Sequence, residues 1–179
     1  MAYGRILLTK IMDIADTEKI EFKDAHGTTM LIGEVVVQII KFAKAAPQYK
    51  YEVVVGTDSE AVNDRPGDLV TAVVVRRVGN GGRYFWRRFS GGPFHTLRNR
   101  IIEEVMTSLR AAQLVLEAIA EALKGTEMKF HFEVHADIGE EGETREMIQE
   151  VTGMIRAHNL DFCVKPNSYA ASTVADRHV

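Results

Sequence analysis

Asp58 is the residue of this sequence that is best placed to do chemistry. Three consecutive valines, at positions 53–55, predict a strand that is buried on both faces. The strand is expected to end in the segment Gly56-Thr57-Asp58-Ser59, so the carboxylate would stand at the edge of a sheet, where a ligand can reach it. The alternative is that Asp58 and Ser59 only form an Asx-type turn. Acids elsewhere in the chain favour the first interpretation.

Three further acids occupy comparable positions. Asp137 ends a predicted strand over 128–138, and it would emerge beside Asp58 if the two strands are parallel neighbours. A long helix begins near the pair Glu103-Glu104. At about 100° per residue, Glu104 lies on the flank of the apolar face and can lean over the sheet edge, whereas Glu103 points to water. Asp176 belongs to the last predicted helix.

A meander of three strands is expected to carry Asp58. The strands are predicted over 51–57, 69–78 and 83–90, and the links between them are short, polar and rich in glycine. Such links favour antiparallel pairing. Residues 1–50 form an entry segment with a small hairpin over 19–24 and 28–32 and a helix from Val35 to Ala43 that Pro47 stops.

Helices and single strands alternate after the meander. The spacing predicts a helix over 96–124, with Thr96 as N-cap and Gly125 just past its end. Strict alternation predicts the half-covered strand 128–138, followed by a helix over 143–158 and a strand over 160–164. The last helix, 169–178, is too short to be stable alone. Packing by Tyr169, Ala170 and Val174, with Ser168 as N-cap, would hold it on the sheet.

These elements predict an α/β fold with a mixed five-stranded sheet, in the order β-β-β-α-β-α-β-α, and with helices on both faces. The domain would cover residues 51–179, after the N-terminal hairpin and helix of 1–50.

Three motifs within this order carry a resemblance to a known family. They are GTDS after the first valine-rich run, HADIG around Asp137, and KPNSYAAS followed by ADR at the C-terminus. Together they resemble the ribonuclease H-like superfamily and, more narrowly, its bacterial YkuK-type family, from Tyr51 onward. The resemblance implies a nuclease in which Asp58, Glu104, Asp137 and Asp176 bind two divalent metal ions and act on RNA, DNA or a hybrid.

Converging carboxylates suit that chemistry. Phosphodiester hydrolysis needs a nucleophilic water, neutralised phosphoryl oxygens and a stabilised leaving group, and two Mg²⁺ or Mn²⁺ ions supply all three. Both ions prefer carboxylate oxygens. Without a metal such a cluster would repel itself, and the pKa of one acid would rise.

Histidine and serine side chains near the acids have other candidate roles. His135 is expected beside the cluster, as a group that supports the metal ligands or shuttles a proton during catalysis. His131 and His135 share a face and could bind zinc, but the sequence provides no evident third ligand. Ser59 is not part of a strand–GxSxG–helix elbow, so it is no predicted nucleophile.

A basic stretch could bind a nucleic acid. The net charge is −3, yet residues 69–102 contain no acid. The predicted contacts are Ser59, Arg76, Arg87, Arg88 and Arg98, and aromatic residues at 84–86 could stack on bases. The alternative is a solvated face whose charges are balanced by acids elsewhere, with the aromatic side chains in the core.

Composition excludes several classes of protein. The 179 residues fit one domain, and 46% hydrophobic content is ordinary for a globular protein. No apolar run is long enough to span a membrane, and the N-terminus lacks a signal-peptide pattern. The single cysteine, Cys163, predicts a core position and a reduced, cytoplasmic setting. Two other functions stay open: an inactive module of the same fold that binds nucleic acid or protein, and phosphoryl transfer to a nucleotide, for which the chain is short.

Overall fold

A seven-stranded mixed sheet is the centre of the fold. The computed structural model describes residues 20–60, 66–141 and 144–179. In these residues the strands lie side by side in the order β2-β1-β5-β4-β3-β6-β7. Their bounds are β1 Glu21–Asp24, β2 Thr29–Leu31, β3 Tyr51–Ser59, β4 Pro66–Arg77, β5 Gly82–Pro93, β6 Phe130–His135 and β7 Asp161–Cys163.

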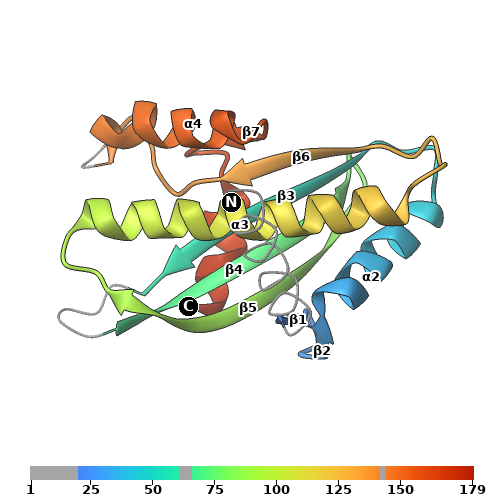
Figure 1. The fold of residues 1–179 in the computed structure, drawn as a ribbon, viewed down its shortest axis with the longest axis horizontal. Helices are drawn as coiled ribbons and strands as arrows, with labels where there is room; N and C mark the ends of the chain where they lie inside the picture. The colour runs from blue at the N-terminus through green and yellow to red at the C-terminus, as the bar shows by residue number, and fades with distance from the viewer. Residues whose placement is uncertain (1–19, 61–65, 142–143) are drawn as a thin grey trace, which may run out of the picture.

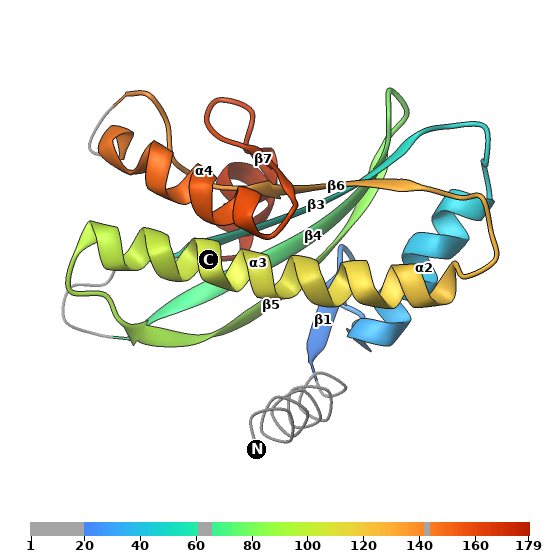
Figure 2. The same ribbon diagram turned by 45° about the horizontal axis from the view of Figure 1, so that its top comes forward.

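Helices cover both faces of this sheet, as the sequence predicts. The long helix α3 lies along one face, and the C-terminal helical segment lies on the other (Figure 1). The same arrangement is visible in the turned view, where α2 packs beside one end of α3 and α4 near its other end (Figure 2). The bounds are α2 Ile32–Lys44, α3 Leu97–Ala122, η1 Arg145–Met147, α4 Ile148–Ala157, η2 Ala170–Ala175 and η3 Asp176–His178.

The predicted number of five strands is wrong, because the N-terminal hairpin joins the main sheet. Strand β1 pairs with β2 and also with the outer edge of β5, where Lys23 lies opposite Trp86. An edge strand as long as β5 would otherwise expose a row of unpaired backbone groups. The hairpin covers part of that edge. Its Phe22, which is only 1% exposed to solvent, belongs to the common core.

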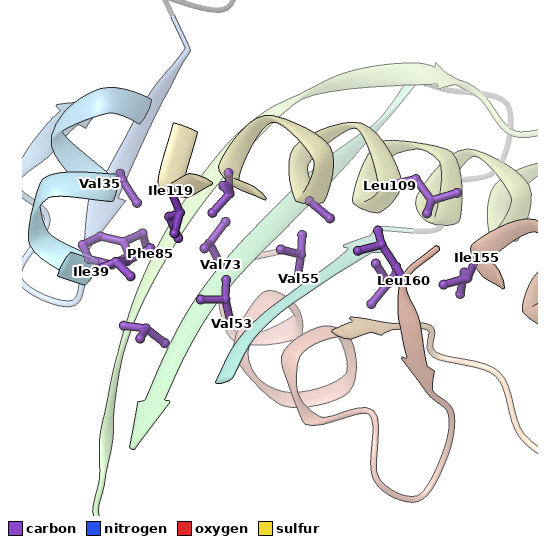
Figure 3. Close-up of a cluster of buried hydrophobic side chains, with 14 of the residues drawn as sticks. Val35, Ile39, Val53, Val55, Val73, Phe85, Leu109, Ile119, Ile155 and Leu160 are labelled. Carbon is purple, nitrogen blue, oxygen red and sulfur yellow. The ribbon is translucent and has the colours of Figure 1, made fainter. Parts of the chain in front are cut away.

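The predicted meander and its parallel neighbour are confirmed. Strands β3, β4 and β5 pair antiparallel in sequence order, and β6 pairs parallel with the free side of β3. The core on the α3 side contains Val53, Val55, Val73 and Phe85, which point from the sheet toward Leu109 and Ile119 of α3 (Figure 3). The sheet is therefore anchored by side chains that alternate along each strand.

Helix α3 has the termini that its sequence predicts. The side chain of Thr96 accepts a hydrogen bond from the backbone N–H of Asn99, which satisfies an N–H group at the start of the helix. Gly125, just past the end, has a φ of +78°, a conformation that glycine adopts without a steric penalty. The apolar stripe of the helix is buried at Ile101, Val105 and Leu109.

Strand β3 extends two residues beyond its predicted end at Thr57. It continues to Ser59, with Asp58 opposite Val70 of β4, so the Asx-turn alternative is wrong. The reason for the glycine lies on the other face of the sheet. A Cβ atom at position 56 would lie only 2.6 Å from the backbone nitrogen of Ala171. Gly56 therefore allows the C-terminal helix to pack directly on the strand.

The C-terminal segment is held by packing, as predicted, but its geometry differs. It is one π-helical segment followed by a 3₁₀ turn. Ala170, Tyr169 and Val174 pack on Val54 and Val74 of the sheet. Ser168 is not the side-chain cap: its hydroxyl makes no hydrogen bond in the described chain, and only its carbonyl accepts from Ala171 and Ser172.

In the part of the chain that the structure describes, no helix is both long enough and apolar enough to cross a membrane.

Candidate active site

Asp58 lies near the end of β3, and Asp137 lies two residues beyond the end of the neighbouring strand β6. Gly56 of β3 is in register with His135 of β6, and each acid follows its residue of this pair by two positions. Because side chains alternate along β3, Asp58 is on the same face as Gly56, the face on which Ala170 and Ala171 pack. Val70, the cross-strand neighbour of Asp58, packs against Ala175, which directly precedes Asp176. Asp58, Asp137 and Asp176 thus lie near enough for the charges of the last two to raise the pKa of the first, which burial raises most.

Asp137 combines a charged partner with an unsatisfied oxygen. Its Oδ2 lies 2.9 Å from the Nζ of Lys165. Its Oδ1 is buried and has no hydrogen-bond partner within the described residues. A buried oxygen without a partner costs free energy, which a cation at this position would remove. Asp137 therefore has the properties of an incomplete ligand.

Glu104 reaches the site from α3 and is buried. Its Oε1 accepts a hydrogen bond of 2.6 Å from the Ser59 hydroxyl, and the Nε of Arg100 is 3.6 Å from the same oxygen. The side chain of Glu104 is 7% exposed, whereas that of Glu103 is 44% exposed and lies 3.9 Å from Arg110. The predicted rotation of the helix is confirmed.

A chain of buried hydroxyl groups fixes α3 against the sheet. The Ser108 hydroxyl lies 2.9 Å from both the Thr57 hydroxyl and the Glu104 carbonyl, and the hydroxyls of Thr57 and Thr71 are 3.0 Å apart. Ser108, Thr57 and Thr71 are each about 1% exposed. These contacts set the height of Glu104 above β3, and the sequence contained no periodic signal for them.

The carboxylates influence one another electrostatically. The pKa of Asp58 is raised to about 6, mainly by burial and also by the charges of Asp137 and Asp176, while the backbone N–H of Ser59 and the charge of Arg100 oppose the change. Burial also raises the pKa of Glu104 to about 7, with Asp58 and Asp137 contributing and Ser59 and Arg100 opposing. The mutual repulsion that the sequence predicts is present in the structure.

The acids do not form a complete set of metal ligands. Across residues 20–60, 66–141 and 144–179, no three side chains of His, Cys, Asp or Glu are arranged so that they could hold a metal ion. Asp176 lies on the exposed 3₁₀ turn, and Glu104 is turned toward Ser59. Carboxylate oxygens are the donors that Mg²⁺ and Mn²⁺ prefer, but the four side chains would have to adjust in order to surround one ion.

His135 anchors the C-terminal helix. Its Nδ1 accepts a hydrogen bond of 3.3 Å from the backbone N–H of Ala170, so Nε2 carries the proton and donates to Glu133 Oε2 at 3.2 Å. Burial lowers the pKa of His135 and keeps the ring neutral. His131 contacts the other oxygen of Glu133 at 3.0 Å. The two histidines thus share a carboxylate. The predicted proton-shuttling role of His135 stays a prediction.

The predicted nucleic-acid contacts are largely engaged within the protein. Arg76 pairs with Glu52, Arg98 pairs with Glu150, and Arg88 lies 2.7 Å from Asp68. Arg87 is half-buried with its guanidinium 4.4 Å from the centre of the Phe89 ring, and Ser59 donates to Glu104. The basic stretch is thus partly neutralised by acids from other elements.

Two cations near the acids were not predicted from the sequence. Arg100 is one turn before Glu104 on α3, and Lys165 follows β7. Lys165 is the first residue of the KPNSYAAS motif, so the motif contained it, but nothing local indicated its partner. Gly139 of the HADIG motif explains how it reaches Asp137, because a Cβ atom at position 139 would lie 3.0 Å from the Cβ of Lys165.

The buried Glu104 makes a testable prediction about stability and pH. Its pKa is raised from 4.5 to about 7 in the folded protein. Between these values the folded state binds a proton that the unfolded chain has lost, so the free energy of unfolding falls as pH rises. Without metal, we expect wild type to lose roughly 2–3 kcal/mol relative to Glu104→Gln between pH 4.5 and pH 8, measured by urea unfolding.

The comparison with the variant removes the effect of His135. Because the pKa of His135 is lowered, its contribution to stability increases as pH rises toward 6.5, opposite in sign to that of Glu104. That contribution is common to both proteins and cancels in the difference. Parallel pH profiles for the two proteins would contradict the prediction.

Comparisons with known proteins show the family of this chain. The sequence model of the family described as Ribonuclease H-like matches residues 34–179, from the start of α2 to the C-terminus. The chain is 31% identical over 164 residues to "Uncharacterized protein YkuK" of Bacillus subtilis (strain 168), and the match covers 87% of this chain and 95% of that protein. No solved structure gives a significant match to the chain.

Proposed function

Because this chain belongs to the Ribonuclease H-like family, we propose that it hydrolyses phosphodiester bonds of RNA, DNA or a hybrid with two bound Mg²⁺ or Mn²⁺ ions. The observation that carries the proposal is the position of Asp58 and Asp137, each two residues past the Gly56–His135 pair of the parallel strands β3 and β6, with Asp137 just beyond the end of β6. In addition to burial, the charges of Asp137 and Asp176 raise the pKa of Asp58, and the charge of Asp58 raises the pKa of Glu104. Neighbouring carboxylates repel one another when they are ionised, and a bound cation would remove this repulsion. The arrangement of the acids therefore favours a cationic ligand.

The four acids would hold the cations. Asp58 and Asp137 are the central candidates, with Glu104 and Asp176 as further ligands. When bound, the ions would supply an activated water, neutralise the phosphoryl oxygens and stabilise the leaving oxygen. Binding also relieves the repulsion that raises the pKa of Asp58.

Other residues of the chain would orient this machinery. The Ser59 hydroxyl and Arg100 both contact Oε1 of Glu104, which leaves Oε2 for another ligand. The hydroxyls of Ser108 and Thr57 hold that part of α3 on β3. His135 accepts a hydrogen bond from the Ala170 N–H and so holds the start of the C-terminal helical segment, which leads to Asp176. A site on such rigid elements keeps reacting groups aligned, which is a large part of catalysis.

A nucleic acid could approach the site across the basic stretch. Arg98 is 61% exposed and Arg88 is 41% exposed, although both have acidic partners. Exposed ion pairs are weak, so phosphate groups could exchange for these carboxylates. Arg76 is likewise 45% exposed, whereas Arg87 and Ser59 are more deeply buried and would need a larger rearrangement.

A second candidate function is an inactive module of the same fold that binds nucleic acid or protein. One observation favours it: in the described residues no three candidate ligands are arranged to hold a metal ion. The two candidates differ in metal binding. Calorimetric titration with Mn²⁺ would give a saturable signal for the nuclease and none for the module.

An activity screen tests the proposal directly. End-labelled single-stranded and double-stranded RNA, DNA and hybrids would be incubated with purified protein and Mg²⁺, Mn²⁺, Ca²⁺ or chelator. We expect cleavage of at least one substrate with Mg²⁺ or Mn²⁺ and none with chelator. An identical preparation of Asp58→Asn controls for contaminating nucleases. Equal cleavage by both preparations, or none by either, would contradict the proposal.

The rotation of α3 makes a second prediction. Glu104 is buried beside the acids and Glu103 faces solvent, so Glu104→Gln should reduce turnover by roughly a hundredfold or more, and Glu103→Gln by less than about threefold. The two variants have the same chemistry and adjacent positions, so each controls for the other. Turnover numbers under saturating metal would decide the point, and equal losses would exclude Glu104 as a ligand.

A further inference from the structure

Lys165 and Asp137 form a contact that the proposed reaction does not use. The ammonium group lies 2.9 Å from Oδ2 of Asp137, the acid at the centre of the site. Lys165 comes from the segment after β7, on the side of β6 away from β3. A cation therefore already occupies one oxygen of a candidate metal ligand.

The path of this side chain is built into the backbone. The N–H of Lys165 donates to the carbonyl of Ile138 at 2.8 Å, which fixes the segment beside the end of β6. Gly139 then provides room for the aliphatic part of the Lys165 side chain, because a Cβ atom at position 139 would lie only 3.0 Å from the Cβ of Lys165. The glycine of HADIG and the lysine of KPNSYAAS thus serve one contact.

The contact is placed for exchange. The Lys165 side chain is 51% exposed, whereas that of Asp137 is 24% exposed. The lysine can turn into solvent at little cost, because a partly exposed ion pair contributes little free energy. Asp137 is less exposed than the lysine, and its Oδ1 is buried without a hydrogen-bond partner in the described chain. Once the ammonium leaves, both oxygens of Asp137 lack a partner.

We propose that Lys165 is a tethered counter-ion of Asp137, which a divalent metal ion must displace in order to bind. The inference rests on the proposed function, since it assumes that Asp137 is a metal ligand. In the metal-free protein the ammonium balances one of the clustered charges. It also weakens metal binding, because it occupies Oδ2 and repels a second cation.

Calorimetric titration with Mn²⁺ at pH 8 tests the proposal. The proteins are wild type, Lys165→Met, Lys165→Arg and Lys124→Met. Methionine keeps the length of the stem over Gly139 but removes the charge, and arginine keeps the charge. Lys124 is the matched control, because it also pairs with an acid, Glu121, and is 72% exposed.

Lys165→Met is expected to bind Mn²⁺ about fivefold more tightly than wild type, the affinity equivalent of one partly exposed ion pair. Lys165→Arg and Lys124→Met should stay within about twofold of wild type. Unchanged or weaker binding by Lys165→Met, or the same gain in Lys124→Met, would overturn the inference and leave the nuclease proposal standing. If neither wild type nor Lys165→Met binds Mn²⁺, the proposed metal-dependent function fails, and the inference fails with it.

Discussion

Asp58→Asn is expected to abolish metal-dependent hydrolysis while the protein stays folded. Besides burial, the negative charges of both Asp137 and Asp176 raise the pKa of Asp58. Loss of a central ligand should reduce turnover by roughly a thousandfold or more. Asparagine keeps an oxygen for the backbone N–H of Ser59 and removes the repulsion. At pH 8 without metal, the variant should therefore be more stable than wild type by about 1 kcal/mol, allowing for partial solvent exposure.

Asp68→Asn is the matched control for this experiment. Asp68 is on the neighbouring strand β4 and pairs with Arg88 at the surface. The same chemical change there should leave turnover within about threefold of wild type. Turnover and urea unfolding of both variants would be measured together. If Asp58→Asn keeps its turnover, or if it unfolds more easily than wild type at pH 8, the assigned role of Asp58 is wrong.

Gly56→Ala is expected to displace the C-terminal helix and to reduce turnover by more than tenfold. The new Cβ would lie 2.6 Å from the nitrogen of Ala171 and 2.9 Å from the carbonyl carbon of Ala170, and backbone atoms cannot rotate away. The helix must move off β3, which should cost about 1–3 kcal/mol of stability. Asp176 moves with it, since the segment Ala170–His178 is continuous.

The single tryptophan reports this movement. The Trp86 ring is stacked on His178 at 4.0 Å between ring centres, with an angle of 5° between the planes. Displacement of the helix should change the intrinsic fluorescence of the native protein. Gly33→Ala is the control, because a Cβ atom in that position of α2 contacts nothing within 4 Å. The experiment would contradict the prediction if both variants kept wild-type fluorescence and turnover.

Elements with a local signal could be predicted from the sequence. Apolar spacing, Thr96 and Gly125 define α3, and the same periodicity separates the buried Glu104 from the exposed Glu103. The alternation over 128–138 predicts the strand β6, whose parallel pairing with β3 is confirmed, although β6 ends at His135, two residues before Asp137. Each of these features depends on residues that are close in sequence or on a repeating pattern.

Features that depend on distant partners could not be predicted. The packing role of Gly56 could not be predicted, because the backbone of Ala171, which requires the glycine, is far away in the sequence. The pairing of β1 with β5 involves two residue pairs, too few to leave a pattern. Arg98 and Glu150 belong to different helices, so the neutralisation of the basic stretch has no local signature. For the same reason, the sequence did not indicate that Lys165 pairs with Asp137.

The parallel pairing of β3 has a consequence for how the chain folds. Strands β3, β4 and β5 can pair through short local links, but the other edge of β3 must wait for β6, which comes after the whole of α3. Until then a valine-rich edge is unpaired, and such edges template association between chains. Long-range pairing is also slow. We therefore expect refolding yield to fall with protein concentration, and any ligand of the finished site to act only after this slow step.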